Sequence, residues 1–288
     1  MLDKNYSFSP ILLNAGIAKH NADWNYNNIS NPFFRIYLIL EGKAQLKMND
    51  VLYTLKPGNL YLIPSFTLHN DMCSGEFSLY YIHVYENQKR AISIFDEYDF
   101  PVEVPADKLS VNLIERLLDL NPNKELQQYD PKTYTNDPAF MKSLAGSGQM
   151  PIDILLETKG ILCQVFSRFI SKAISSGIKN DARIWSAVHY IRDHINNKIK
   201  ISELAGHCNL SNDHLIRLFK KELNTTPIDY INRKKIEKAQ LMLVIENNTI
   251  KEVAYALAFE NISYFNKVFR KILNKTPTEY KKEMIAFT

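Results

Sequence analysis

Cysteine is scarce in this chain, and long apolar runs are missing. The 288 residues include only three cysteines, Cys73, Cys163 and Cys208, which form no CxxC pair. Such a set predicts neither a disulfide framework nor a structural zinc site, and it is typical of a reducing compartment. No stretch approaches the ~18 uncharged apolar residues of a membrane helix, and the opening MLDKNYSFSP lacks the apolar core of a signal peptide. We therefore expect a cytoplasmic protein with no membrane partner.

Patterns that carry catalysis are also missing. The sequence has no Gly-rich phosphate loop, no Ser/His/Asp spacing pattern and no carboxylate cluster. His69 and His83 lie 14 residues apart without a His-x-His motif, whereas a metal site needs several ligands close together. A structural role is the simpler interpretation of both histidines. We expect no catalytic residues, no metal and no cofactor, and hence a protein that is not an enzyme.

Positive charge is concentrated toward the end of the chain. Residues 181–288 hold 18 Lys and Arg against 12 Asp and Glu, whereas residues 1–180 hold 17 against 19. A basic region joined to a slightly acidic one points toward polyanion binding by the C-terminal part. Charge alone does not separate a DNA-binding domain from an ordinary soluble one, so this indication needs support from motifs.

The first hundred residues have the pattern of short β-strands. Five segments rich in aromatic and β-branched residues are separated by turn signals such as Glu41-Gly42-Lys43 and Pro57-Gly58-Asn59. The segments are FFRIYLIL, AQLKM, VLYTL, LYLIP and FSLYYIHVY. Many short strands at this spacing predict a small antiparallel barrel or sandwich over residues 1–105.

Helical periodicity follows the strands. The spacing of four leucines predicts a helix over 108–120, and a broad apolar face predicts a second helix over 151–176. The leucines are Leu109, Leu113, Leu117 and Leu120. Residues 121–150 have no apolar period and are expected to form a long loop. The segments Ser175-Ser176-Gly177 and Lys179-Asn180 make 177–181 the best linker candidate.

The C-terminal part contains an internal repeat. The segment ISELAGHCNLSNDHLIRLFKKELNTTPIDY (201–230) matches IKEVAYALAFENISYFNKVFRKILNKTPTEY (250–280). Core positions pair at an offset of 49 before a one-residue insertion and at an offset of 50 after it. Both copies end in Thr-Pro-x-x-Tyr. Aligned core positions together with two aligned Thr-Pro signals indicate that one structural unit occurs twice.

Each copy is typical of a helix, a short turn and a second helix. Ser211 and Asn261 follow the turns and are suited to cap the second helices. In a helix-turn-helix unit the second helix enters the major groove of DNA. A helix over 227–244 would join the two units. Its length of ~27 Å could hold two readers about one DNA turn (~34 Å) apart on one face.

The repeat and the joining helix give the chain a resemblance to a known family. Two helix-turn-helix units joined by a long helix, each ending in Thr-Pro-x-x-Tyr, resemble the DNA-binding domain of the AraC/XylS family over 181–283. The segment EGKAQLKMNDVLYTLKPGNLYLIPSFTLH is similar to the cupin-like sensor barrel often joined to it. The resemblance implies an α+β protein of two domains. An N-terminal cupin-like antiparallel β-barrel with flanking helices would serve ligand sensing and dimerisation over 1–176, and an all-α double helix-turn-helix domain would occupy 182–288.

Three departures from the family pattern stand out. Ala258-Phe259 replaces the usual Gly-Phe of the second turn, and alanine is costly there if φ is positive. Asp213 and Ile216 occupy positions of the first recognition helix where polar or basic readers are common, so that helix is expected to make fewer base contacts. Lys200, rather than Ser or Thr, precedes the opening helix of the first unit.

Helix positions opposite the buried Leu215 and Phe219 are expected to face DNA. Arg217 can make a bidentate contact with a guanine edge, Lys220 suits a phosphate, and Asn266 is of a type that reads adenine. The whole expected set is Ser211, Asp213, Ile216, Arg217 and Lys220 in the first unit and Asn261, Ser263, Asn266, Lys267 and Arg270 in the second. A solvated charged face is the alternative interpretation, and the repeat weighs against it.

Arg35, Tyr37 and His69 are the candidate ligand-binding residues. Arg35 and Tyr37 alternate with apolar residues, so they share one face of a strand. If that face lines the barrel, Arg35 could hold an anionic or hydroxylated ligand; an outward-facing Arg35 is the alternative. The resemblance to sugar-sensing relatives implies that His69 could line the ligand cavity.

These observations predict a sequence-specific transcription regulator, an activator that responds to a ligand. Its expected partners are double-stranded DNA, a small-molecule effector with a sugar as one candidate, and a second copy of the chain in a homodimer. RNA polymerase is a further candidate partner. The alternative from another class is a cupin-type enzyme with an accessory helical domain. An RNA-binding or purely structural module is disfavoured because stacking motifs are absent and the repeat has groove spacing.

Overall fold

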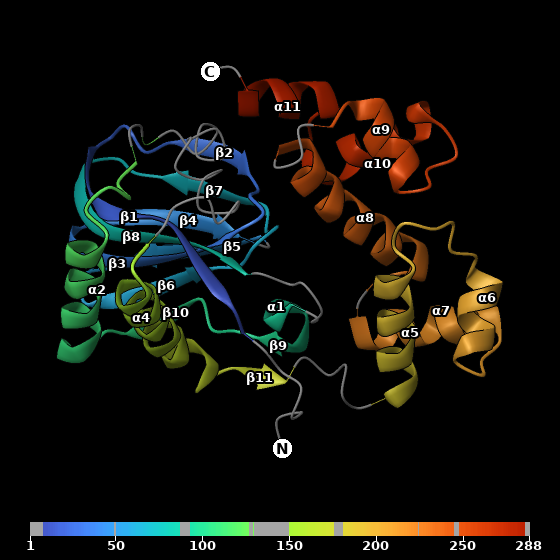
Figure 1. Cartoon of the computed structure of the whole chain (residues 1–288), viewed down its shortest axis with the longest axis horizontal. Coiled ribbons are helices and arrows are strands. Elements are labelled where there is room, and N and C mark those ends of the chain that lie inside the picture. Colours follow the sequence, from blue (N-terminus) through green and yellow to red (C-terminus); the bar gives the residue numbers. More distant parts are fainter. Residues whose placement is uncertain are drawn as a thin grey trace. The chain divides into compact units, whose positions relative to one another are not determined.

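The chain divides into two compact units, which are described separately (Figure 1). The β unit comprises 1–95, 100–173 and 283–288, and the helical unit comprises 96–99 and 174–282. The structure is a computed structural model, and it describes residues 8–48, 50–86, 93–126, 129, 150–175, 181–223, 225–244 and 248–285. Most of the loop expected over 121–150, and most of the linker expected over 177–181, lie outside these residues.

Two antiparallel sheets form the β unit. The five-stranded sheet has the order β1-β8-β3-β6-β10, and the four-stranded sheet has the order β2-β7-β4-β5. The first consists of β1 (Pro10–Asn21), β8 (Glu76–Glu86), β3 (Phe34–Gly42), β6 (Asn59–Ile63) and β10 (Glu103–Pro105). The second consists of β2 (Tyr26–Ile29), β7 (His69–Met72), β4 (Ala44–Met48) and β5 (Val51–Leu55). The expected antiparallel β fold is confirmed, with the described strands in two sheets rather than one hydrogen-bonded ring.

The register of β3 decides which side chains lie between the sheets. Arg35 and Tyr37 pair with His83 and Tyr81 of β8, so these four side chains point to one face of the five-stranded sheet. Arg35 contacts His69 of β7, so that face is the one turned toward the four-stranded sheet. The alternative of an outward-facing Arg35 is therefore wrong.

A glycine permits the close turn that leads from β3 to β4. Gly42 has a φ of +75°, and a Cβ built on it would lie 2.1 Å from the carbonyl oxygen of Glu76. No side chain fits at that distance, so this position requires glycine.

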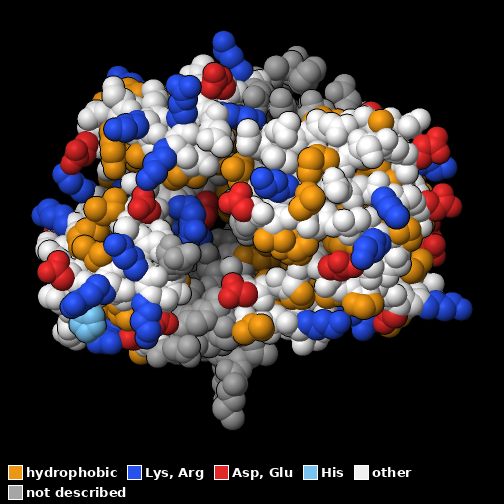
Figure 2. Space-filling model, turned by 180° about the vertical axis from the view of Figure 1, so that it is seen from behind, with side chains coloured by type: hydrophobic (Ala, Val, Ile, Leu, Met, Phe, Trp, Pro, Cys, Tyr) orange, Lys and Arg blue, Asp and Glu red, His pale blue; other side chains and the backbone are white. Residues whose placement is uncertain are grey.

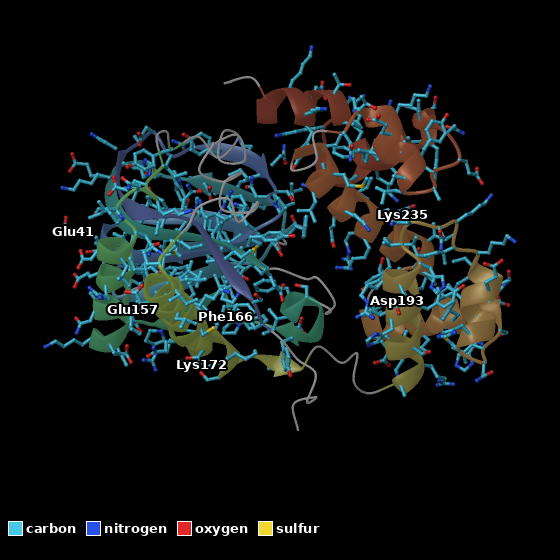
Figure 3. All side chains as sticks on the ribbon, in the orientation of Figure 1. Glu41, Glu157, Phe166, Lys172, Asp193 and Lys235 are labelled. Carbon is cyan, nitrogen blue, oxygen red and sulfur yellow. The ribbon has the colours of Figure 1, made fainter. Side chains whose placement is uncertain are left out.

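The other face of the five-stranded sheet is covered by two helices. α2 (Lys108–Leu120) and α4 (Ile152–Ile170) pack against each other and on β1, and the Phe166 ring of α4 lies 5.4 Å from the ring of Phe34. Figure 3 places Phe166 and Glu157 on α4. Arg116 of α2 donates to Glu157 at 2.7 Å. The short helix α1 (Ile94–Glu97) follows β8 in sequence.

The second helix ends earlier than expected. α4 stops at Ile170, and Ile174–Ser175 forms β11, which pairs with β9 (Tyr98–Asp99). The prediction of a helix over 151–176 is wrong at its C-terminal end. The hydroxyl of Ser171 donates to the carbonyl oxygen of Arg168 at 3.0 Å, which illustrates how serine side chains compete with helical hydrogen bonding.

The helical unit contains the repeat as two runs of elements in the same order. α5 (Ala182–Asp193) precedes the first run of α6 (Ile201–His207) and α7 (Asn212–Leu223). α8 (Pro227–Val244) joins it to the second run of α9 (Ile250–Ala256) and α10 (Ile262–Leu273), and α11 (Pro277–Ile285) follows. The aligned apolar residues are buried in both runs, namely Leu215, Leu218 and Phe219 in α7 and Phe265, Val268 and Phe269 in α10. No described helix meets the length and hydropathy needed to cross a membrane.

The two turns share a positive φ and a hydrogen bond at equivalent positions. Asn209 has a φ of 53° and Ala258 a φ of 50°, at positions 49 residues apart. The next residue of each turn donates its N–H to a carbonyl of the preceding helix, Leu210 to Ala205 at 2.9 Å and Phe259 to Ala254 at 3.0 Å. The positive φ anticipated at Ala258 is therefore present.

Replacing Ala258 with glycine should stabilise the protein. A left-handed conformation costs a residue with a Cβ about 1–2 kcal/mol, and the greater freedom of glycine in the unfolded chain offsets about 0.4–1 kcal/mol of the gain. We expect Ala258→Gly to raise the free energy of unfolding by ~0.5–1 kcal/mol in urea titrations. The control Ala254→Gly, inside α9, should lower it by ~1 kcal/mol. Equal destabilisation by both substitutions would contradict this account of the turn.

Candidate nucleic-acid interface and effector site

The exposed face of α7 carries the residues expected to meet DNA. The hydroxyl of Ser211 accepts a hydrogen bond from a backbone N–H in the first turn at 3.3 Å, which confirms its capping role. Asp213, Arg217 and Lys220 are exposed, and Ile216 is half-buried. This face therefore presents one guanidinium and one ammonium beside one carboxylate. The carboxylate of Asp213 would repel a phosphate.

The exposed face of α10 is more uniformly polar and basic. Asn261 caps this helix by accepting a first-turn N–H at 2.7 Å. Ser263, Asn266, Lys267 and Arg270 are all exposed, and no Asp or Glu occurs between Ile262 and Leu273. The second unit thus offers hydrogen-bonding and cationic groups without an acidic neighbour on its own helix.

Most of these cations are not used inside the protein. Among the described residues, Arg217, Lys220 and Lys267 take part in no ion pair or hydrogen bond through their side chains. By contrast, Lys271 of α10 pairs with Asp229 of α8 at 2.9 Å, which ties the two helices together. Figure 2 shows Lys and Arg side chains spread over the helical unit, with acidic side chains interspersed among them. Unpaired cations on such a face can neutralise phosphates.

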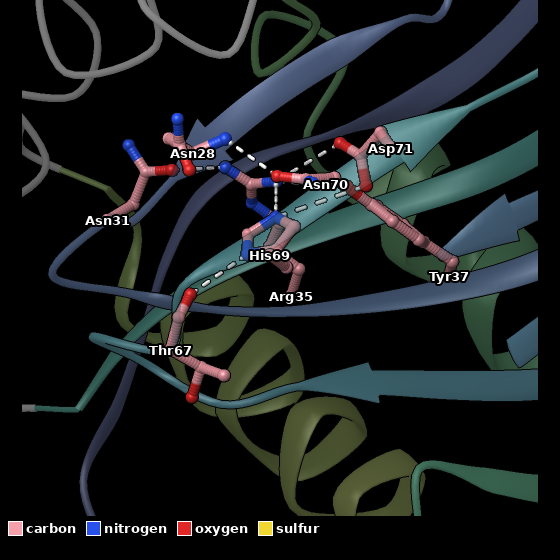
Figure 4. A network of polar contacts seen from close by, with 8 residues as sticks. All are labelled: Asn28, Asn31, Arg35, Tyr37, Thr67, His69, Asn70 and Asp71. Atoms are coloured by element: carbon pink, nitrogen blue, oxygen red, sulfur yellow. Dashed lines mark hydrogen bonds and ion pairs between the residues drawn. The ribbon is translucent and has the colours of Figure 1, made fainter. Parts of the chain in front are cut away.

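A polar cluster lies between the two sheets of the β unit (Figure 4). Arg35 is 1% exposed. Its Nη1 donates to Tyr37 Oη at 3.4 Å and to His69 Nε2 at 2.9 Å, and its Nη2 donates to Asn31 Oδ1. The three residues that the sequence suggested as ligand-binding are therefore brought together. All three lie in the interior of the β unit, between its two sheets, rather than on its surface.

The hydrogen bonds of His69 fix its tautomer. Its Nδ1 lies 2.9 Å from the carbonyl oxygen of Thr67, which can only accept, so Nδ1 carries the proton. Nε2 is then the acceptor for Arg35. Burial and the positive charge of Arg35 lower the pKa of His69 to about 3. His69 is thus a neutral side chain that orients Arg35.

Asp71 is the member of this cluster that the sequence reasoning missed. It is 0% exposed, and its carboxylate lies 3.9 Å from Arg35 Nη1 and 4.0 Å from His69 Nε2. Neither carboxylate oxygen accepts a hydrogen bond from a described residue. Burial raises the pKa of Asp71 to about 7, although the charge of Arg35 opposes the shift. The His69-x-Asp71 spacing on one strand face was the available signal.

Aromatic side chains pack beside the polar cluster. The Trp24 ring lies 6.0 Å from the Tyr37 ring and 5.1 Å from the Phe77 ring, and Trp24 is buried. Burial raises the pKa of Tyr37 to about 12, so its hydroxyl stays protonated. No group of three or more His, Cys, Asp or Glu in the described part of the chain could hold a metal ion. The cluster is built for hydrogen bonding.

Two family models match the chain. A helix-turn-helix domain model matches residues 204–283, and an AraC-like ligand binding domain model matches residues 14–129. Together they cover more than half of the chain, in the order that the fold shows. The chain belongs to the AraC/XylS family of transcription regulators. The resemblance drawn from the repeat is confirmed.

Curated relatives of this AraC-family chain are transcription regulators. The xylose operon regulatory protein of Escherichia coli K12 is 32% identical over 101 residues, which are 35% of this chain and 26% of that relative. The uncharacterized HTH-type transcriptional regulator YisR of Bacillus subtilis is 22% identical over 259 residues, which are 86% of this chain and 85% of that relative. The chain spans only about a quarter to a third of the length of the first curated relatives that it matches.

A solved structure shares the whole two-unit fold. ToxT of Vibrio cholerae with a bound unsaturated fatty acid gives a TM-score of 0.55 at 17% identity, over 100% of this chain and 99% of that one. This likeness supports the architecture of the AraC-family chain and no more than that.

The raised pKa of Asp71 predicts a pH-dependent stability. Between pH ~4 and ~7 the folded state keeps a proton on Asp71 that the unfolded state has lost, so this residue makes the fold less stable as pH rises. One pKa unit corresponds to about 1.4 kcal/mol, so the contribution is a few kcal/mol. In Asp71→Asn, relative to wild type, the free energy of unfolding should rise over this range.

The comparison uses urea unfolding at several pH values. The exposed Asp50 allows the same substitution as a control, and Asp50→Asn should leave the pH profile unchanged. A constant difference between wild type and Asp71→Asn from pH 4 to 7 would show that Asp71 ionises normally in the fold.

Proposed function

We propose that this chain is a ligand-responsive activator of transcription that binds operator DNA through both helix-turn-helix units. The observation that carries the proposal is the pair of exposed polar faces on α7 and α10, joined by the single helix α8. At ~1.5 Å per residue the 18 residues of α8 span ~27 Å, which suits two readers in successive major grooves. The protein is not an enzyme in this proposal, and it acts in the cytoplasm.

The two helix-turn-helix units are proposed to contribute unequally to the recognition of DNA sequence. Arg217 is the one strong base reader of α7, because Asp213 repels phosphate and Ile216 offers only an apolar contact to a thymine methyl group. Asn266, Lys267 and Arg270 act together in α10. Specificity should therefore be concentrated where Arg217 meets DNA.

Substitution of Arg217 tests this assignment. Arg217→Ala should weaken binding to the selected operator by ~1–3 kcal/mol and relax preference at one or two base pairs. Lys220→Ala should weaken binding to all sequences alike and make the salt dependence shallower by about one unit of slope. Binding-site selection and fluorescence anisotropy on both variants supply the comparison. Unchanged affinity and preference in Arg217→Ala would mean that another face of α7 meets DNA.

The effector is proposed to bind in the cluster around Arg35 and Asp71. The guanidinium can donate to a ligand oxygen, and the carboxylate can accept from a ligand hydroxyl. Charges of opposite sign side by side favour a neutral hydroxylated molecule over an anion. The buried Trp24 offers an apolar ring face beside these polar groups, which is a composition typical of small-molecule sites. A sugar meets these requirements.

A panel of pentoses and hexoses tests this proposal. D-xylose is the first probe because a relative is the regulator of a xylose operon. A ligand at 100 times its Kd should raise the free energy of unfolding by about 2.7 kcal/mol. Asp71→Asn should weaken that effect, and the exposed control Asp50→Asn should retain it. A sugar that stabilises both variants equally would bind elsewhere.

A homodimer is the proposed assembly, with RNA polymerase as a further partner on activated promoters. Leu109 of α2 and Leu156 of α4 are exposed on the helix pair, whereas Leu117 is buried in the β unit. Exposed leucines on packed helices suit a contact with a second copy. The leucines at helical spacing on α2 therefore include buried and exposed members.

A further inference from the structure

Lys235 is a buried lysine in the middle of α8 (Figure 3). It is 5% exposed, and it lies between Ile231 and Ala239, which are also buried. Lysine is almost never fully buried unless its ammonium group is paired. Here no carboxylate within the described residues pairs with it. The groups that satisfy this ammonium must therefore be found among uncharged acceptors.

One of its acceptors lies just before the first helix-turn-helix unit, and the other belongs to the second. The Nζ of Lys235 donates to the carbonyl oxygen of Asn197 at 3.0 Å and to that of Leu257 at 2.6 Å. Asn197 lies in the segment that leads from α5 to α6, and Leu257 is the C-cap of α9. The ammonium also lies 5.4 Å from the ring centre of Phe259 in the second turn. One side chain of the joining helix thus contacts the segment that leads into the first unit as well as α9 and the second turn.

Helix electrostatics explain why a cation fits there. The C-terminal end of a helix carries partial negative charge on carbonyl groups that no helical N–H satisfies. Leu257 presents such a carbonyl, and Asn197 follows the end of α5. The aromatic face of Phe259 adds a favourable cation–π contact. Two carbonyl oxygens and an aromatic ring therefore take the place of water around the Lys235 ammonium group. These groups lie where the segment before α6 meets the second helix-turn-helix unit.

A second contact joins the same two segments, but it is solvent-exposed. Lys198 pairs with Glu260 at 2.7 Å, and their side chains are 63% and 62% exposed. Exposed ion pairs of this kind add little stabilising free energy, because water and salt screen the attraction between the two charges. Lys235 is the buried connection, so it is better placed than the Lys198–Glu260 pair to fix how one unit is rotated relative to the other.

We propose that Lys235 is a positioning residue that sets the relative rotation of α7 and α10, and thereby the spacing between half-sites that the protein accepts. This inference rests on the proposed binding of both units to one duplex. One turn of DNA contains 10–10.5 base pairs, so a change of one base pair rotates a half-site by about 35°. Units held at a fixed angle discriminate such a change, whereas units free to rotate do not.

The experiment uses the full chain and duplexes whose half-sites are moved apart or together by one and two base pairs. Wild type should bind the selected spacing about tenfold more tightly than either neighbour, as expected when one reader is misplaced. Lys235→Met keeps the apolar stem and removes the ammonium group. It should bind the three central spacings within about threefold of one another. Its affinity for a single half-site should remain that of wild type.

The control is Lys238→Met, which removes a charge from the same helix at a half-buried position. It should keep the sharp spacing preference even if its overall affinity falls. A purely structural role for Lys235 would lower binding to all duplexes alike and leave their ratios unchanged. If circular dichroism shows Lys235→Met to be unfolded, Lys235→Gln carries the same comparison.

The outcomes separate this inference from the proposed function. A folded Lys235 variant with the wild-type spacing profile would overturn the role of Lys235. Failure of wild type to bind any duplex at low salt would overturn the proposed function instead. Lys235→Arg retains a cation with several donors, and recovery of a single spacing optimum in that variant would support the assignment.

Discussion

One continuous helix joins the two helix-turn-helix units of this protein. α8 begins at the Thr-Pro signal that ends the first unit and stops shortly before the cap of α9. Because it has no interruption between Pro227 and Val244, the distance between α7 and α10 is set by covalent geometry rather than by a flexible linker. Side-chain contacts along α8, above all those of the buried Lys235, can then determine the angle between the two helix-turn-helix units.

The β unit depends on a different constraint, the burial of charge. Arg35 and Asp71 lie between two sheets with almost no exposure to water, and burying charged groups is costly unless they are paired and hydrogen-bonded. Arg35 meets this condition through Tyr37, His69 and Asn31, whereas the oxygens of Asp71 accept no hydrogen bond from any described residue. A fold optimised only for stability would place apolar side chains there. This polar interior is what supports the proposal of a ligand site.

Much of this organisation could be predicted from local signals. The repeat predicted both helix-turn-helix units because its Thr-Pro signals and apolar positions are short-range features. The five predicted strands match β3, β4, β5, β6 and β8 to within about two residues. β1 was missed because Asn14, Ala15 and Gly16 interrupt the alternation of apolar and polar residues in a strand that is largely buried.

Residues whose role depends on distant partners were harder to predict. Arg35 and Tyr37 share a strand face, so their proximity was foreseeable, but Asp71 acquires its significance only when β7 packs opposite β3. Lys235 looked like one cation among several in α8, and its acceptors are 38 and 22 residues away. Its place in an apolar stripe with Ile231 and Ala239 was a weak signal. Sequence periodicity shows which face is buried, but it does not show which carbonyl groups lie there.

The central claim is that both recognition helices meet one face of the same duplex in successive major grooves. Hydroxyl-radical footprinting of the full chain on a selected operator measures this directly. The account predicts two protected segments whose centres lie about 10 base pairs apart on one face of the helix. Protection confined to a single groove, or two segments on opposite faces, would contradict it.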